Sequence, residues 1–316
     1  MAWNLGANDA ASPCGTPVGT GVIGITRAII LFSIFTAIGA VLQGYMNVKT
    51  ISSGVVPRID PLGAITITLA AGVWSTLCTW KGLEISNTYS IVGSVIGYAL
   101  VVYGSFEVSV ISNIVASWVI SPLISIVLAF MLYKLFTRLF KNYLDNARFQ
   151  RVISISLLVS LCFSAYGFGA NNIGLATGVF VAVTQEVAGL PDSSTMLILA
   201  LFSALGVAVG GLTWGHRVIR TIAFKIVRID ALSGLAAQST NALVVFLFVT
   251  IPYLYLGYGI PVSTSIVGIG ALIGTSLAKK DGTINKSTMG RLVITWILTI
   301  PITATISATL YTILTH

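Results

Sequence analysis

The chain has 316 residues, of which 56% are hydrophobic and 8% are charged, with a formal net charge of +8. A soluble domain carries about a quarter charged residues, so this composition excludes a soluble globular protein. Apolar runs of about 18 residues or more can cross a hydrocarbon core of about 30 Å, and they exclude a β-barrel, whose strands are short and alternating. Such runs occupy 22–46, 62–80, 110–133, 231–256 and 289–314. The sequence therefore predicts an all-α polytopic membrane protein.

The first polar feature is GANDAASPCGTPVGTG at 6–21, which places Asn8 and Asp9 close to the start of the chain. A carboxylate inside a membrane segment costs about 2.5 kcal/mol or more, so it usually faces a cavity, a partner or an ion. Amide and carboxylate oxygens suit Na⁺, and protonation of Asp9 is the other way to carry a coupling ion. Because so few residues precede this sequence, a position of Asp9 at the aqueous surface is the alternative.

Two short clusters of hydroxyl and amide side chains interrupt the apolar pattern further along the chain. They are Ser86-Asn87-Thr88 and Ser263-Thr264-Ser265. Each cluster precedes a glycine-punctuated apolar segment that is short for a full crossing. The first N–H groups of a helix lack intrahelical acceptors and the helix dipole favours an anion there, so hydroxyl donors would complete a cradle for a tetrahedral oxyanion. The alternative is that these residues only cap the two helices.

Basic residues gather in the middle of the chain, between two apolar runs. The members of this group are Lys134, Arg138, Lys141, Arg148 and Arg151. Loops rich in Lys and Arg mostly face the cytoplasm, so we expect the connection at 134–151 to be cytoplasmic. This placement favours orientation in the membrane over nucleic-acid binding as the reason for the positive charge.

The chain repeats itself. GAND at 6–9 returns as GANN at 169–172, and ISNTYSIVGSVIG at 85–97 returns as VSTSIVGIGALIG at 262–274. The matches keep their order, which predicts two homologous transmembrane repeats. Their bounds are 1–145 and 146–316. Duplicated, inverted halves with broken helices are typical of secondary transporters, which bind substrate between the repeats near the middle of the membrane.

The two signatures differ in what precedes them. GANN follows an apolar run at 152–168 that is long enough for most of a crossing, whereas GAND follows only MAWNL. By symmetry, we expect the N-terminal helix of the first repeat to be truncated.

Sequence signals for other classes of membrane protein are absent. The chain has two histidines and no HExxH, GxSxG or paired catalytic carboxylates, so it lacks the groups that acid–base catalysis requires. It has no Walker A sequence, and its three scattered cysteines have no metal-ligand spacing. We therefore expect a transporter and not an enzyme, with no cofactor except the coupling ion. A channel or membrane scaffold is the remaining alternative.

With GAND, GANN and GIPVSTS as its motifs, the chain resembles the inorganic phosphate transporter (PiT) family over essentially its whole length. The resemblance implies Na⁺- or H⁺-coupled symport of inorganic phosphate across the cell membrane, inverted repeats with re-entrant helical hairpins, and a homodimer. It implies that the residues of the cation sites are Asn8, Asp9, Asn171 and Asn172. It implies that the residues holding the anion are Ser86, Asn87, Thr88, Ser263, Thr264 and Ser265.

The chain departs from the family pattern in both halves. Asn172 stands where the family usually has aspartate, and the first hydroxyl motif has Asn87 and lacks the proline that the second has at Pro261. The paired asparagines and KTISSGVVP at 49–57 also look like the sulfate permeases grouped within this family, so sulfate is the alternative substrate. Phosphate carries a proton that a carboxylate can accept, whereas sulfate only accepts hydrogen bonds, so Asp9 favours phosphate.

Overall fold

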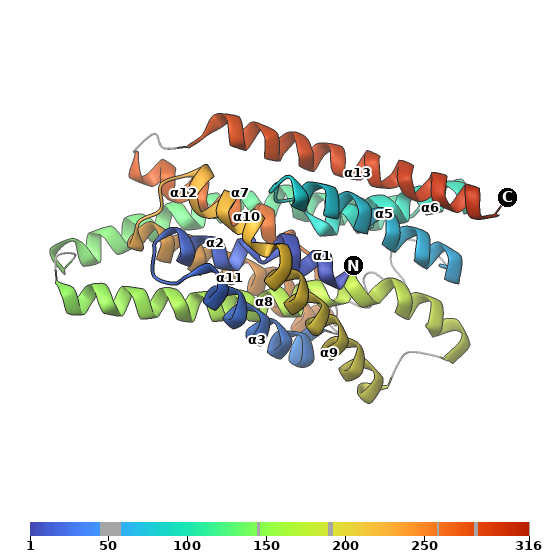
Figure 1. The fold of residues 1–316 in the computed structure, drawn as a ribbon, viewed down its shortest axis with the longest axis horizontal. Helices are drawn as coiled ribbons and strands as arrows, with labels where there is room; N and C mark the ends of the chain where they lie inside the picture. Colours follow the sequence, from blue (N-terminus) through green and yellow to red (C-terminus); the bar gives the residue numbers. More distant parts are fainter. Residues whose placement is uncertain (45–57, 144–145, 189–191, 258, 281–283, 316) are drawn as a thin grey trace.

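The computed structural model describes residues 1–44, 58–143, 146–188, 192–257, 259–280 and 284–315, and these residues form helices and no strands. Figure 1 shows the long helices gathered into one bundle. The elements are α1 (Ala2–Asn4), η1 (Leu5–Asp9), α2 (Ala11–Gly19), α3 (Ile25–Gln43), α5 (Pro61–Trp80), α6 (Asn87–Val102), α7 (Val108–Phe140), η3 (Lys141–Tyr143), α8 (Ala147–Ala188), α9 (Ser193–Gly210), η4 (Gly211–Gly215), α10 (His216–Thr221), η5 (Ile222–Ile226), α11 (Ala231–Leu256), α12 (Thr264–Lys279) and α13 (Lys286–Thr315). The segment 49–57, which suggested sulfate, lies outside the described residues.

Seven helical segments of the described chain are long and apolar enough to cross a membrane. They are Ile25–Gln43, Pro61–Trp80, Val108–Phe140, Ala147–Val181, Ser194–Ile226, Ala231–Leu256 and Lys286–Thr315. Their outward faces carry large apolar side chains such as Met131 and Phe202, which are 61% and 75% exposed and would meet lipid. The all-α polytopic class predicted from composition is confirmed.

Two further apolar helices, α6 and α12, have 16 residues each. At 1.5 Å per residue, each is about 24 Å long, which is shorter than a hydrocarbon core of about 30 Å. Each follows a longer helix, α5 or α11, and each begins at a buried hydroxyl cluster. The short helices expected after the two clusters are therefore present.

Polar caps fix where several helices begin. Asp60 caps the first turn of α5, and Pro61 opens that turn, where a missing N–H costs nothing. Asp230 forms a capping box with Ser233 at the start of α11. The carboxylate of Asp230 also lies 2.9 Å from Nζ of Lys279, the last residue of α12. This ion pair ties the far end of α12 to the start of α11.

Glycines let each short helix approach a long helix from the other half of the chain. At Gly97 of α6, an added Cβ would lie 2.1 Å from the carbonyl oxygen of Ala304 in α13. At Gly274 of α12, it would lie 2.2 Å from the carbonyl oxygen of Ile126 in α7. A larger side chain would push either pair of helices apart. The close run of α13 along α6 is visible in Figure 1.

The two signature segments cross other helices in the same way. A Cβ at Gly6 would lie 1.8 Å from the carbonyl oxygen of Val207 in α9. A Cβ at Gly169 of α8 would lie 2.1 Å from the carbonyl oxygen of Thr36 in α3. Early and late parts of the chain are therefore interleaved.

The basic segment is more helical than the loop expected at 134–151. Lys134 belongs to α7 and Arg148 belongs to α8. Apolar side chains pack across the connection between these helices, and the ring centroids of Phe140 and Phe149 lie 5.0 Å apart. Lys and Arg are good helix formers, so basic residues with apolar residues at helical spacing extend the two helices beyond the apolar runs.

Candidate functional site

Both hydroxyl clusters lie at the start of a short helix, where Ser86 and Ser263 are the N-cap residues. Oγ of Ser86 accepts a hydrogen bond from the backbone N–H of Tyr89 at 3.3 Å. Oγ of Ser263 accepts one from Ile266 at 3.4 Å. Both distances are at the long end of the hydrogen-bond range. Capping is therefore one role of these two serines.

The other four members of the clusters follow the caps and are all buried. They are Asn87, Thr88, Thr264 and Ser265. Within the described chain, the hydroxyl groups of Thr88 and Thr264 form no hydrogen bond, although the carbonyl oxygen of Thr264 accepts one from Ser12. These two hydroxyls remain able to donate to a bound anion.

GAND supports the connection that leads into α6. Nδ2 of Asn8 donates hydrogen bonds to Oγ1 of Thr79 and to the carbonyl oxygen of Leu83, each at 2.9 Å. Its Oδ1 accepts a hydrogen bond from the N–H of Ile85 at 2.9 Å. One amide thus provides the hydrogen-bond partners that an irregular connection lacks in its own backbone.

GANN supports the connection that leads into α12. Nδ2 of Asn171 donates to the carbonyl oxygen of Val262 at 2.8 Å, and Oδ1 accepts from the N–H of the same residue at 3.3 Å. Asn172 differs, because its Nδ2 donates to the carbonyl oxygen of Phe168 within its own helix at 3.2 Å. GAND forms the π-helical turn η1, whereas GANN lies inside the uninterrupted helix α8, so the local break in helical geometry occurs at GAND.

Asp9 lies between the two hydroxyl clusters. The side chain is buried, so the alternative of an aqueous surface position is wrong. Its Oδ1 accepts hydrogen bonds from Nδ2 of Asn87 at 2.8 Å and from Oγ of Ser265 at 3.4 Å. Asn87 opens α6 and Ser265 lies in the first turn of α12. One carboxylate oxygen therefore joins the N-termini of both short helices, where helix dipoles favour negative charge.

A neighbouring polar network was not predicted from the sequence. Oγ of Ser12 donates to the carbonyl oxygen of Thr264 at 2.9 Å and accepts from Nδ2 of Asn241 at 3.2 Å. The same Nδ2 lies 3.0 Å from Oγ of Ser164. The available signal was AAQSTNA at 236–242, which places four consecutive polar residues inside the apolar helix α11. Through the hydrogen bond from Ser12 to Thr264, this network holds the first turn of α12.

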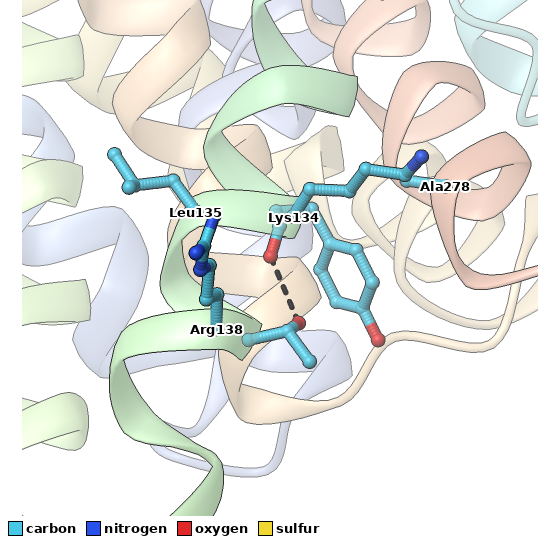
Figure 2. Close-up of a pocket in the computed structure, with 6 residues that line it drawn as sticks. Lys134, Leu135, Arg138 and Ala278 are labelled. Atoms are coloured by element: carbon cyan, nitrogen blue, oxygen red, sulfur yellow. Dashed lines mark hydrogen bonds between the residues drawn. The ribbon is translucent and has the colours of Figure 1, made fainter.

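The surface recess drawn in Figure 2 lies apart from this cluster, at the end of α7. It has a volume of about 490 Å³ and is lined by Tyr133, Lys134, Leu135, Thr137, Arg138 and Ala278. In Figure 2 the side chain of Lys134 extends toward Ala278 of α12. Neither Asp9 nor either hydroxyl cluster lines the recess, so the buried cluster is the better candidate site.

The buried cluster combines neutral side-chain donors, the first turns of two helices and a carboxylate. The part of the chain that the structure describes holds no group of three or more His, Cys, Asp or Glu side chains that could bind a metal ion. This chemistry suits reversible binding of an anion beside a monovalent cation.

Known proteins resemble this chain in sequence and in fold. A family model described as the phosphate transporter family matches residues 5–307. A protein of Thermococcus kodakarensis named "Putative phosphate permease" is 27% identical, over 99% of this chain and 95% of that protein. A chloroplastic inorganic phosphate transporter of Arabidopsis thaliana is 25% identical, over 99% of this chain and 70% of that protein. A solved structure entitled "The sodium-dependent phosphate transporter" has the same fold, with a TM-score of 0.87 and 24% identity, over 100% of this chain and 96% of that one.

Proposed function

Because the chain belongs to the phosphate transporter family, we propose that it carries inorganic phosphate across the membrane together with Na⁺. The observation that carries this proposal is the position of Asp9, whose Oδ1 accepts hydrogen bonds from both Asn87 and Ser265. A cation bound at Asp9 neutralises a carboxylate that would otherwise repel the anion. Binding of either ion then favours binding of the other.

The anion is held at the N-termini of α6 and α12. The donors are the first backbone N–H groups of both helices and the side chains of Ser86, Asn87, Thr88, Ser263, Thr264 and Ser265. This set contains no Lys or Arg, so the helix dipoles and neutral donors supply the attraction. A site without a permanent cation releases its anion readily once the coupling ion leaves.

The coupling cation binds at Asp9, and the three asparagines of the two signatures shape its site. Asn8 and Asn171 hold the connections before α6 and α12 through hydrogen bonds to Ile85 and Val262. Asn172 lies one residue further along α8. Na⁺ is supported as the coupling ion by the sodium-dependent transporter that shares this fold.

The pattern of helix contacts supports two interleaved repeats. Gly97 and Gly274 occupy equivalent positions of the repeated segments 85–97 and 262–274, and each faces a carbonyl oxygen of the opposite half, that of Ala304 or Ile126. Each short helix therefore rests on the last helix of the opposite half. Movement of one half against the other would expose the shared site to alternate sides of the membrane.

The basic ends of α7 and α8 define the orientation that we propose. They lie at the same end of the bundle, joined by the segment 141–146, and the positive-inside rule places that end in the cytoplasm. The protein is then a multi-pass protein of the cell membrane.

Uptake into proteoliposomes tests the proposed function. Purified protein is reconstituted, and accumulation of radiolabelled phosphate is measured with an inward Na⁺ gradient and with choline in place of Na⁺. We expect accumulation only with the Na⁺ gradient. Equal uptake in the two conditions would contradict symport, and strong inhibition by unlabelled sulfate, with accumulation of sulfate itself, would favour the alternative substrate.

A pair of variants connects the flux to the site. Replacing both Ser263 and Thr264 with alanine should abolish saturable uptake, because this removes two proposed donors from one helix N-terminus. Ser112→Ala is the matched control, since Ser112 is exposed on α7 and its hydroxyl bonds only within its own helix. Loss of uptake in both variants, or in neither, would argue against the assignment.

A further inference from the structure

Glu84 is a buried carboxylate that the proposed anion and cation contacts do not include. It lies in the connection between α5 and α6, two residues before the cap Ser86. Its side chain is 0% exposed, and neither Oε1 nor Oε2 has a hydrogen-bond partner in the described chain. An ionised carboxylate in this state is strongly unfavourable, so the site requires a proton or a metal cation.

The fold does not need this carboxylate. The carbonyl oxygen of Glu84 accepts a hydrogen bond from Nε1 of Trp296 at 3.0 Å. At the equivalent position of the second half, the carbonyl oxygen of Pro261 accepts one from Oγ of Ser117 at 3.3 Å. The backbone carbonyl is therefore hydrogen-bonded in both halves, by different donors and without use of the carboxylate. The carboxylate is the feature that the first half adds.

Among the residues that the structure describes, Asp9 of η1 is the acidic group that acts on Glu84 electrostatically. From α12, the hydroxyl of Ser265 lies nearby without forming a well-aligned hydrogen bond to Glu84. From α13, the neighbour is the neutral indole of Trp296. No Lys or Arg of the described chain is among the groups that act on Glu84. Arg217 of α10 donates from Nη1 to the carbonyl oxygen of Trp80 at 3.1 Å, and Lys81 is exposed.

Two residues that follow Glu84 contact the GAND signature. The N–H of Ile85 donates to Oδ1 of Asn8 at 2.9 Å, and Nδ2 of Asn87 donates to Oδ1 of Asp9 at 2.8 Å. Besides the two oxygens of Glu84, Oδ1 of Asn87 is buried and has no partner in the described chain, and Nδ2 of the same side chain contacts Asp9. Carboxylate, amide and hydroxyl oxygens are hard ligands that suit Na⁺. Two neighbouring carboxylates also favour retention of one proton, because like charges at short range disfavour full ionisation.

We propose that Glu84 and Asp9 form a single cation site at which H⁺ and Na⁺ compete, with Glu84 as the group that holds the proton. Binding of Na⁺ converts the carboxylic acid of Glu84 into a carboxylate that coordinates the metal, and the proton leaves to solvent. Charge balances, because one monovalent cation replaces another. This inference deepens the proposed function, on which its link to transport rests, but ion exchange itself is measurable without phosphate.

Proton release on addition of Na⁺ tests the exchange directly. Purified protein in detergent, weakly buffered and free of phosphate, receives NaCl or, as the control, choline chloride, while a pH indicator records released protons. We expect about one proton per chain with Na⁺ and none with choline, because a metal that binds an acidic site displaces its proton. In the wild type, the apparent Na⁺ affinity should fall about tenfold for each unit of decreasing pH in the range where the proton competes.

Glu84→Gln and Glu84→Pro separate Glu84 from Asp9. Glutamine keeps the shape of the side chain and cannot release a proton, and proline is the residue that the second half carries. Both variants should lose Na⁺-driven proton release and show a Na⁺ affinity that no longer changes with pH. Undiminished release from Glu84→Gln, or no release from the wild type, would overturn the proposal.

The proposal and the function fail in different ways. If Na⁺ releases protons but phosphate does not accumulate, the proposed function is contradicted and the cation site is supported. If Na⁺ drives phosphate uptake with the same pH profile in the wild type and in Glu84→Gln, the proposed function is supported and the role of Glu84 is contradicted. Comparing both proteins with the same phosphate solution cancels the change in phosphate ionisation with pH.

Discussion

Asp9 and Glu84 are neighbouring buried carboxylates with different surroundings. The carboxylate of Asp9 accepts hydrogen bonds from Asn87 and Ser265, whereas the carboxylate oxygens of Glu84 have no hydrogen-bond partner in the described chain. Hydrogen bonds to a carboxylate favour its charged form, so Asp9 is the better permanent ligand and Glu84 the better proton carrier. Two groups of the same chemical type therefore take different roles in the proposed cation site.

Asp9→Asn should weaken Na⁺ dependence while preserving the local geometry. The amide oxygen of asparagine can still accept from Asn87 and Ser265, but the charge that attracts Na⁺ is lost. Charged hydrogen-bond partners contribute about 1.5–3 kcal/mol, which corresponds to a rise of roughly ten- to a hundredfold in the Na⁺ concentration for half-maximal uptake. Asp192→Asn, at the exposed N-cap of α9, is the matched control and should leave this concentration unchanged. Equal values for Asp9→Asn and the wild type would contradict the role of Asp9.

Thr264→Val and Ser263→Ala should separate anion binding from capping. The hydroxyl of Thr264 is free in the described chain, so its loss should raise the KM for phosphate by roughly two- to tenfold with little change in Tm. Ser263 caps α12, so its loss should cost about 1 kcal/mol of stability, visible as a lower Tm. If Thr264→Val lowered Tm and left KM unchanged, a structural role would replace the binding role.

The sequence motifs identified the polar residues that lie buried inside the protein. All ten predicted site residues are buried, and Ser86 and Ser263 begin the helices that the clusters predicted. Which of these residues cap a helix and which bond to Asp9 could not be predicted, because the answer depends on contacts between segments that are distant in sequence. The two hydrogen bonds of Asp9 join residues separated by 78 and 256 positions. No local pattern encodes such a pairing.

At the scale of the elements, the short helices α6 and α12 are held by long helices of the opposite half. The contacts are close because glycines face carbonyl oxygens at Gly97 and Gly274. The sequence indicated the glycines and the shortness of the helices, but it could not identify the partner helix. The basic residues at 134–151 predict a loop, whereas much of this segment is helical, because Lys and Arg are good helix formers.

Gly97→Ala should destabilise the packing of α6 on α13. The new Cβ would lie 2.1 Å from the carbonyl oxygen of Ala304, so the helices must separate, at a cost of about 1–3 kcal/mol. Gly290→Ala is the matched control within a helix, since nothing lies within 4 Å of its Cβ position. We expect the control to be neutral or to gain about 0.5–1 kcal/mol. Thermal unfolding in detergent measures both, and equal Tm values would contradict the close approach.

At the scale of the whole molecule, helices from the first and second halves of the chain pack between one another around the buried cluster. Composition predicted the membrane class, and the ordered motifs predicted the repeats. Long-range contacts such as that between Gly6 and Val207 show how early and late helices interleave, which sequence similarity alone does not reveal. The orientation in the membrane rests on the basic ends of α7 and α8.

Cysteine accessibility tests this orientation. In a background lacking Cys14, Cys78 and Cys162, Asn146→Cys should react with a membrane-impermeant maleimide only after the cells are permeabilised, because the segment follows the positive-inside rule. Ser105→Cys, before the opposite end of α7, should react in intact cells. Both positions are exposed, so access and not burial decides the result. The reverse pattern would invert the proposed topology.

The central claim is that one carboxylate links the cation to the anion, and equilibrium binding of phosphate tests it most directly. The Kd of purified protein for radiolabelled phosphate is measured in NaCl and in choline chloride at equal ionic strength, for the wild type and Asp9→Asn. Coupling between two sites is typically about 1–3 kcal/mol, so Na⁺ should lower the wild-type Kd by roughly 5- to 150-fold and leave the Kd of the variant nearly unchanged. A wild-type Kd that is the same in both salts, or an equal effect of Na⁺ on the variant, would contradict the account.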